Sequence, residues 1–323
     1  MLNERKCAII GCGFVGATTA YTLMQSGMFS EMVLIDIDKK KAEGEAADLG
    51  HGLPFHAPMD IYAGDYSDLS DCFLIIITAG ANQKPGETRI DLVRRNVTVF
   101  TSIVSSIVKY NNEAILLVVT NPVDILTHVT CKLSGFPPER VIGSGTVLDT
   151  ARLKYLIGKK LGVDSRNVHS FIIGEHGDSE LPVFSSANIS GIDLNHFCGT
   201  GTHYKLCDAC DTDSLFKLFE DAKNSAYHII ENKGATYYAI AESVKRIVTA
   251  IVKDETAILP VSALLEDYYG ISNLCLGVPC VVGKSGIKNI LEIPLDDHEL
   301  SLLRESADKL RNIVDDLEAQ AVI

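Results

Sequence analysis

The sequence predicts an α/β protein in which a doubly wound parallel sheet is followed by an α+β domain. The first observation is a set of short apolar runs rich in β-branched residues, at positions 7–10, 32–35, 73–78 and 115–120. Such continuous apolarity is typical of parallel strands that are buried on both faces. The second observation is that longer segments with helical spacing, such as 17–28 and 88–110, lie between these runs. Strands that alternate with helices indicate a parallel sheet with crossover helices.

The pattern changes near residues 141–145, so we expect a first domain over residues 1–143 and a second over 144–323. A chain of 323 residues is long enough for about two domains. In the second domain we expect helices at 149–161, 214–231, 235–251 and 298–317, a strand before His176, and further strands between 257 and 295. The last helix places Leu303, Leu310 and Val314 on one apolar face.

Composition and charge exclude several classes of function. With 46% hydrophobic and 22% charged residues, the chain can bury a sizeable core. The formal net charge of −13, without a basic block, argues against a nucleic-acid or anionic-membrane partner. No run approaches the ~18 apolar residues of a membrane span, and the first residues lack a targeting pattern. We therefore expect a soluble, cytoplasmic protein.

The 9 cysteines are scattered, several of them within apolar runs, as expected of reduced thiols in a cytosolic protein. Cys207 and Cys210 form an isolated Cys-x-x-Cys pattern in the polar stretch 199–213. A zinc site would need two more ligands, and although His203 is near, no second pair follows. We expect no metal, and the role of this pair stays open.

A glycine-rich motif, Gly-Cys-Gly-Phe-Val-Gly at residues 11–16, follows the first strand and opens a helix. In a Rossmann-type domain, Gly11 makes the tight turn, Gly13 lets a pyrophosphate approach the backbone, and Gly16 permits close helix–strand packing. The helix N-terminus supplies N–H groups and a partial positive charge for the anion. The alternative is a glycine turn without a ligand.

Asp36 ends the second predicted strand, about 20 residues after the motif, where an acidic residue hydrogen-bonds the adenine ribose. Its carboxylate would repel a 2′-phosphate, so we expect NAD rather than NADP as the cofactor. Further candidate cofactor-binding residues are Phe14, Val15, Gly80, Asn121 and Ser144.

His176 lies in the stretch Ile-Ile-Gly-Glu-His-Gly-Asp at residues 172–178. Histidine exchanges protons near neutrality because its unperturbed pKa is about 6.5. Glycines on both sides and an apolar run before it predict a buried strand that delivers the imidazole to a turn. A histidine that merely ends a strand is the alternative.

Asp149 and Arg152 are three residues apart and therefore share one helical face. A surface salt bridge would explain the pair without any function. As functional residues, Arg152 would offer its planar fork to a substrate carboxylate, while Asp149 would fix the tautomer of His176 and raise its pKa.

The segment 78–89 follows the third predicted strand and is rich in Gly and Pro. Ligands bind at the carboxyl ends of such strands, so this segment is a candidate lid over the substrate. Arg89 is where the lid re-enters a helix, and the alternative for it is a solvated arginine at a helix start. Asn121 follows the next strand and is expected to bridge cofactor and substrate, unless Asn-Pro is simply a turn.

Together these motifs resemble the NAD-dependent L-lactate dehydrogenases of the lactate/malate dehydrogenase family, over nearly the whole chain. The resemblance also rests on Thr-Asn-Pro-Val-Asp at 120–124 and Gly-Ala-Thr-Tyr-Tyr at 234–238. It implies that His176 exchanges the proton, Asp149 is its partner, Arg152 clamps the carboxylate and Arg89 polarises the reacting carbonyl. It further implies that Thr236 lines the substrate pocket and that the enzyme is a homotetramer.

Gln83 bears on the choice between lactate and malate. The resemblance implies that malate enzymes carry an arginine at this position for the second carboxylate of oxaloacetate. A neutral amide would leave that carboxylate unpaired, at a cost of several kcal/mol in a dry site. The sequence therefore favours lactate and pyruvate, with malate or a longer 2-hydroxyacid as alternatives.

Many bacterial lactate dehydrogenases are activated by fructose 1,6-bisphosphate, which an arginine and a histidine bind between subunits. The matching positions here hold Lys154 and His169. Lysine pairs a phosphate without the bidentate fork of arginine, so activation is left open, with ordinary surface groups as the alternative.

A non-catalytic dinucleotide-binding protein is the remaining alternative. Such a protein would need the glycine motif and Asp36 but none of the catalytic groups, all of which are present here.

Overall fold

The computed structural model describes residues 1–81, 89–197 and 212–320. The first part of the chain alternates strands and helices as β1 (Asn3–Ile10), α1 (Phe14–Met24), β2 (Glu31–Ile35), α2 (Lys39–Gly52), β3 (Asp60–Ala63), β4 (Cys72–Ile77), α3 (Arg89–Val108), β5 (Ile115–Val118), α4 (Val123–Ser134) and β6 (Val141–Gly143). The second part comprises α5 (Val147–Leu161), β7 (Val168–Ile173), β8 (Leu181–Ile189), β9 (Ile192–Asp193), α6 (Leu194–Phe197), α7 (Thr212–Lys233), α8 (Tyr238–Val252), β10 (Ala257–Leu265), β11 (Leu274–Gly283), β12 (Gly286–Ile290) and α9 (Asp297–Ala319).

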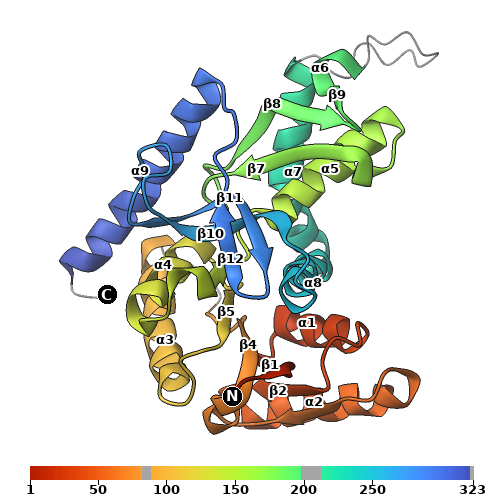
Figure 1. Ribbon diagram of the computed structural model, residues 1–323, viewed down its shortest axis with the longest axis vertical. Helices are drawn as coiled ribbons and strands as arrows, with labels where there is room; N and C mark the ends of the chain where they lie inside the picture. The colour runs from red at the N-terminus through yellow and green to blue at the C-terminus, as the bar shows by residue number, and fades with distance from the viewer. Residues whose placement is uncertain (82–88, 198–211, 321–323) are drawn as a thin grey trace.

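The larger sheet of the described residues has the strand order β12-β11-β10-β6-β5-β4-β1-β2-β3. Its run from β6 to β3 is entirely parallel, which confirms the predicted doubly wound sheet. The chain order reverses between β1 and β4, and in such sheets the ligand crevice lies outside the carboxyl ends of the strands at this point. In Figure 1 these strands occupy the lower part of the molecule, between helices such as α1 and α3.

The sheet continues into the second half of the chain, which the apolar pattern alone did not predict. β10 pairs antiparallel with β6 through Ser262 and Gly143, and β11 and β12 extend the same edge. Hydrogen bonds of one sheet therefore cross the expected boundary near residue 143, so the two halves share a sheet.

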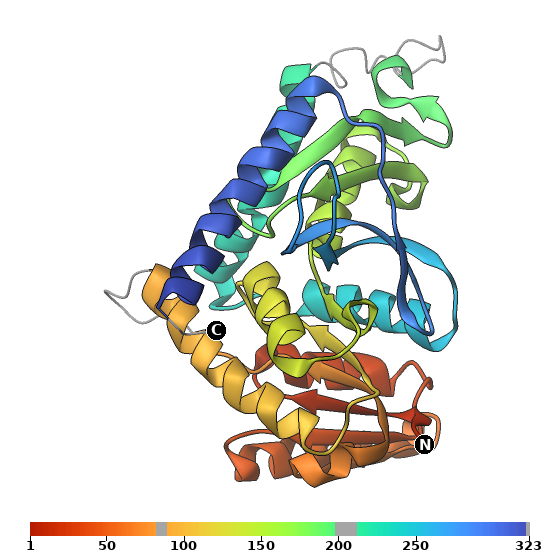
Figure 2. The ribbon, with the colours of Figure 1, turned by 60° about the vertical axis from the view of Figure 1, so that its left-hand side comes forward.

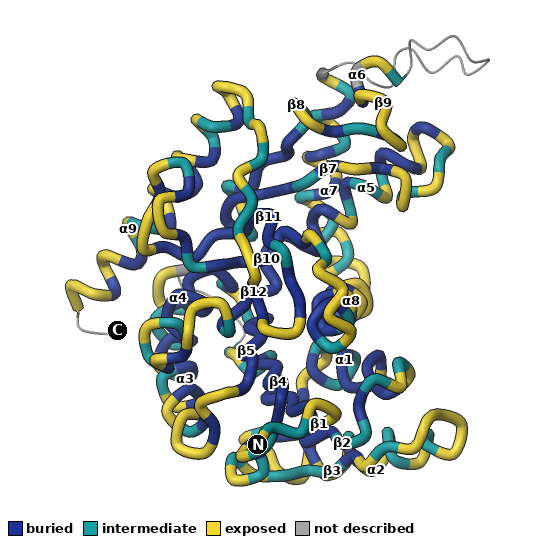
Figure 3. Tube along the Cα trace, in the orientation of Figure 1, coloured by how far each residue is buried: buried dark blue, intermediate teal, exposed yellow. Residues whose placement is uncertain are grey.

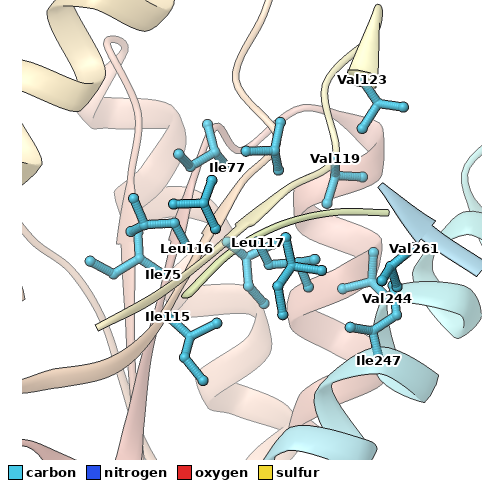
Figure 4. Close-up of a cluster of buried hydrophobic side chains, with 14 of the residues drawn as sticks. Ile75, Ile77, Ile115, Leu116, Leu117, Val119, Val123, Val244, Ile247 and Val261 are labelled. Carbon is cyan, nitrogen blue, oxygen red and sulfur yellow. The ribbon is translucent and has the colours of Figure 1, made fainter. Parts of the chain in front are cut away.

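The core is built around the central strands. Every residue of β4 and β5 is buried, because helices cover both faces of the sheet. Figure 3 shows this buried layer running through the centre of the molecule. Side chains of β4 and β5 pack with Val244 and Ile247 of α8 and Val261 of β10 (Figure 4), so the apolar core spans both halves of the chain.

A second, smaller sheet of order β7-β8-β9 is antiparallel and packs with α5 and α7 around a separate apolar cluster, which includes Leu153, Ile172 and Phe219. Figure 2 shows α9 running from this region down to the end near α3, where Arg94 and Asp316 form an ion pair of 3.1 Å. None of the helices among residues 1–81, 89–197 and 212–320 is long and apolar enough to cross a membrane.

Candidate active site

The glycine-rich turn between β1 and α1 has the shape that a pyrophosphate requires. Gly11 has φ of 103°, a conformation that side chains disfavour, and a Cβ at Gly16 would lie 1.8 Å from the carbonyl oxygen of Gly11. A Cβ at Gly13 would instead meet nothing within 4 Å. The turn therefore packs tightly at Gly16 and stays open at Gly13, beside the N-terminus of α1, where backbone N–H groups attract an anion.

Asp36 is fixed beside this turn, just past the end of β2. One carboxylate oxygen accepts the backbone N–H of Cys12 at 2.6 Å, and the other accepts that of Asp38 at 2.9 Å. A carboxylate has further acceptor sites, so Asp36 can still take hydroxyl donors from a ribose. Phe14 and Val15 begin α1 here, and the exposed ring of Phe14 stacks on Tyr237 at 5.4 Å.

The candidate proton-transfer residues meet around one carboxylate. The Oδ2 of Asp149 lies 2.5 Å from Nδ1 of His176, and its Oδ1 accepts a hydrogen bond of 2.8 Å from Nη1 of Arg152. The side chain of Asp149 is 2% exposed and that of Arg152 only 12%, so this pair is not a surface salt bridge. One helix, α5, therefore supplies both the carboxylate that orients the imidazole and the guanidinium that pairs with this carboxylate.

Electrostatics favour the protonated imidazole. Burial lowers the pKa of His176, but the charge of Asp149 and its hydrogen bond act against burial, and the pKa is raised to about 9. For Asp149, burial acts to raise the pKa. His176, through its charge and hydrogen bond, and then the charge of Arg152 oppose burial and hold the pKa of this carboxyl below its ordinary value. The surroundings of His176 thus favour its imidazolium form at neutral pH.

Hydrogen bonds also fix the position of the backbone around His176. Gly174, with φ of 93°, exchanges two backbone hydrogen bonds with Gly277 of β11. The N–H of His176 donates to Oδ2 of Asp124 at 2.7 Å, and Oδ1 of Asp124 accepts the hydroxyl of Ser262 at 2.6 Å. Burial raises the pKa of Asp124 to about 6 against these hydrogen bonds. The large sheet and α4 thereby hold the backbone that carries the imidazole.

A cavity of about 370 Å³ opens over these groups. Its walls come from α3, the segment after β5, α5, the turn after β7, and α7, whose arrangement is visible in Figure 1. The described residues that line it are Leu92, Val93, Asn121, Pro122, Asp149, Arg152, His176, Gly177, Asp178, Glu180, Lys223, Ala226, Tyr227 and Ile230. The cavity lies past the carboxyl end of β5, where ligands of parallel sheets bind.

Other predicted site residues are not among the described residues that line this cavity. Ser144 is buried just after β6, and its N–H donates to the carbonyl of Val118 at 2.8 Å. Gly80 follows β4 and packs against Thr120, and Thr236 lies in the α7–α8 connection, outside the set of described lining residues. Gln83, Cys207 and Cys210 lie outside the described residues, as does the side chain of Arg89, whose backbone begins α3.

The two residues considered for fructose 1,6-bisphosphate lie away from the cavity wall. Lys154 is half-buried on α5, and burial lowers its pKa. His169 is exposed on β7.

Four residues that matter to the site were missed by sequence reasoning. Asn96, 1% exposed on α3, accepts the N–H of Ala81 at 2.7 Å and donates to the carbonyl of Asn121 at 3.0 Å. Asp124 holds His176, and Glu180 and Lys223 line the cavity. Asn96 could have been identified from the sequence as a polar residue on an otherwise apolar helical face. The sequence around Glu180 contains no comparable signal.

The comparisons with known proteins agree with this architecture. Residues 5–143 match the family model of the lactate/malate dehydrogenase NAD binding domain, and residues 146–321 match that of the lactate/malate dehydrogenase alpha/beta C-terminal domain. The chain belongs to the lactate/malate dehydrogenase family, a class of dinucleotide-dependent oxidoreductases.

Its relatives point to one branch of this family. The chain is 58% identical over 315 residues to an L-lactate dehydrogenase of Acetivibrio thermocellus, covering 97% of this chain and 98% of the relative. It is 54% identical to an L-lactate dehydrogenase of a Thermoanaerobacter species, covering 97% and 99%. Among solved structures, it is similar to the minor L-lactate dehydrogenase of Enterococcus mundtii, with a TM-score of 0.92, 41% identity and coverage of 97% and 98%.

Proposed function

We propose that this protein is an NAD-dependent L-lactate dehydrogenase, which interconverts L-lactate and pyruvate. The observation that carries the proposal is the buried carboxylate of Asp149, shared between His176 and Arg152 in the wall of one cavity. A proton donor beside a guanidinium is what the reduction of a 2-keto acid requires. The relatives named above carry the same activity in their names.

The residues divide the work as follows. Arg152 binds the substrate carboxylate through a charge-assisted hydrogen bond, which sets the keto carbon near His176. Protonated His176 donates its proton to the carbonyl oxygen of pyruvate as that oxygen gains negative charge, and neutral His176 takes the hydroxyl proton of lactate in reverse. Asp149 stabilises the imidazolium throughout. The family resemblance gives Arg89 the task of polarising the same carbonyl.

NAD is the proposed cofactor, and when bound it supplies or accepts the hydride. The open space at Gly13 and the N–H groups of α1 would hold its pyrophosphate, while Asp36 would bind the adenine ribose and disfavour a 2′-phosphate. We assign Gly80, Asn121 and Ser144 to the rest of this site, and residues 1–143 and 144–323 to the cofactor and substrate domains.

Pyruvate is the proposed substrate over oxaloacetate, because Gln83 offers no charge to a second carboxylate. Following NADH oxidation at ~0.1 mM cofactor with each keto acid tests the proposal, since this is an ordinary KM range. The expected result is turnover of pyruvate with a higher kcat/KM than oxaloacetate. Gln83→Arg is expected to move this preference toward oxaloacetate. No turnover of pyruvate by the folded protein would overturn the function.

A homotetramer and activation by fructose 1,6-bisphosphate through Lys154 and His169 are finer proposals that rest on the family resemblance. Light scattering checks the first. Initial rates with and without the sugar bisphosphate check the second, and an unchanged apparent affinity for pyruvate would exclude activation.

A further inference from the structure

Glu180 is a buried acid in the wall of the active-site cavity with no assigned task. It lies between the turn that carries His176 and the first residue of β8, and it is 6% exposed. Its Oε1 is buried and has no hydrogen-bond partner among the described residues. A buried carboxylate without donors is costly, so such a group tends to be neutral.

Glu299 shows how the same fold treats a buried glutamate that does have donors. It is 5% exposed, and its Oε1 accepts the backbone N–H groups of Phe184 and Ser185 at 2.8 and 2.9 Å. Its Oε2 accepts the hydroxyl of Ser185 at 2.5 Å. These donors suit a carboxylate anion. Glu180 is buried to the same degree but lacks this set of donors at Oε1.

The neighbours of Glu180 are charged. One carboxylate oxygen of Asp149, one of Glu180 and one ring nitrogen of His176 all lie within 4.8 Å of one another. Burial and then the negative charge of Asp149 raise the pKa of Glu180 to about 9, although His176, Lys223 and Arg152 oppose them. The titratable and charged described residues that line the same cavity are Asp149 and Arg152 from α5, His176 and Asp178 from the turn, and Lys223 and Tyr227 from α7.

We propose that Glu180 stays protonated at neutral pH, so that it adds no negative charge to the cavity beside a monocarboxylate substrate. This inference rests on the proposed function. Among the described residues that line the cavity, the two charges of Asp149 and Asp178 balance those of Arg152 and Lys223, which leaves the charge of protonated His176 for the carboxylate of pyruvate. An ionised Glu180 would cancel this charge and repel the substrate anion. It would also hold the proton on His176 more tightly.

Infrared spectroscopy tests the protonation state without any turnover. In the difference spectrum of wild type minus Glu180→Gln at pH 7, we expect a carbonyl stretching band of a protonated carboxyl group. The matched control is Glu299→Gln, whose difference spectrum should show carboxylate bands instead. Carboxylate bands for Glu180 at pH 7 would overturn the proposal, provided that circular dichroism shows both variants to be folded.

The pKa of His176 gives a second, independent readout, followed by NMR of labelled histidine and assigned with His176→Asn. If Glu180 is neutral at neutral pH, Glu180→Gln should leave the protonated fraction of His176 unchanged between about pH 6 and 8, since over that range it removes no charge. If Glu180 is an anion, losing a charge so close should lower the pKa by about one unit or more.

The pH profile links the proposal to catalysis. Above pH 9 the kcat/KM for pyruvate should fall more steeply in wild type than in Glu180→Gln, because wild type loses two protons and the variant one. Equal slopes would contradict the proposal. An absent carboxyl band with pyruvate still reduced would refute the inference alone, whereas a folded protein that does not reduce pyruvate refutes the proposed function.

Discussion

The proposed active site has two sides that differ in chemistry, a backbone turn on the cofactor side and buried charged side chains on the proton-transfer side. The cofactor side is a backbone turn. The absence of side chains at Gly11, Gly13 and Gly16 determines how closely the backbone packs and where a ligand can approach it. The proton-transfer side is made of buried charges, in which Asp149 sets both the direction and the pKa of His176. The first side should therefore respond to changes in volume, and the second to changes in charge at constant volume.

The largest effect should follow loss of the imidazole on the charged side. His176→Asn keeps a similar volume but cannot exchange protons, so kcat for pyruvate should fall by about 10²–10⁴-fold, the usual contribution of general acid–base catalysis. Stopped-flow kinetics measures this. NADH binding, followed by fluorescence, serves as the control and should be unchanged, because the glycine turn is untouched. Undiminished turnover would refute the role of His176.

Arg152→Lys keeps the charge but removes the planar fork, and it also changes a partner of Asp149. We expect kcat/KM for pyruvate to fall by about 10²-fold, because the lysine ammonium is a point charge that cannot make the two parallel hydrogen bonds of the guanidinium to a carboxylate. The fall should appear largely in KM, as a steady-state titration with pyruvate would reveal. A change of less than about threefold would show that the fork is not the carboxylate clamp.

Two glycine substitutions on the cofactor side distinguish a glycine needed for backbone packing from one that leaves room for the cofactor. Gly13→Ala should leave the Tm of the apo protein nearly unchanged, because its Cβ meets no atom within 4 Å. It should weaken NADH binding by about tenfold, since the Cβ occupies the place of the pyrophosphate. Gly16→Ala should lower the Tm, because its Cβ would lie 1.8 Å from a carbonyl oxygen. Calorimetry and NADH titration of both variants decide this, and identical behaviour would contradict it.

The smallest effect is expected at Asp124, which holds the backbone of His176. Asp124→Asn can still accept the N–H of His176, so kcat/KM should change by no more than about threefold, whereas Asp124→Ala loses the hydrogen bond and should cost about tenfold. Steady-state kinetics at pH 7 compares the two. Equal losses in both variants would mean that the charge of Asp124, and not its hydrogen bond, matters.

Much of the fold could be predicted from the sequence, because the patterns that indicate its strands and helices lie within short segments of the chain. The apolar runs that form β1, β2, β4 and β5 are continuous, and the glycine motif marks the start of α1 directly. The joining of β10 to β6 was not predictable from periodicity, because it depends on a pairing between Ser262 and Gly143, far apart in the chain.

The candidate site likewise contains some residues that local patterns identify and others that only long-range contacts reveal. Asp149 and Arg152 were identified because they share a helical face, and His176 because glycines flank it. Asp124 reaches His176 across 52 positions and Ser262 across 138, which no local pattern encodes. Glu180 has an ordinary sequence context, and only its burial beside Asp149 makes it unusual.

The pH dependence of kcat/KM for pyruvate in wild type and Asp149→Asn tests most directly that a buried carboxylate keeps the imidazole charged. Reduction needs protonated His176, whose pKa is raised to about 9, so wild-type activity should hold through neutral pH and fall to half near pH 9. In the variant, burial remains but the negative charge is gone, so the midpoint of the fall should lie more than about two units lower, at or below the ordinary pKa of about 6.5. The same alkaline limit in both proteins would contradict the account.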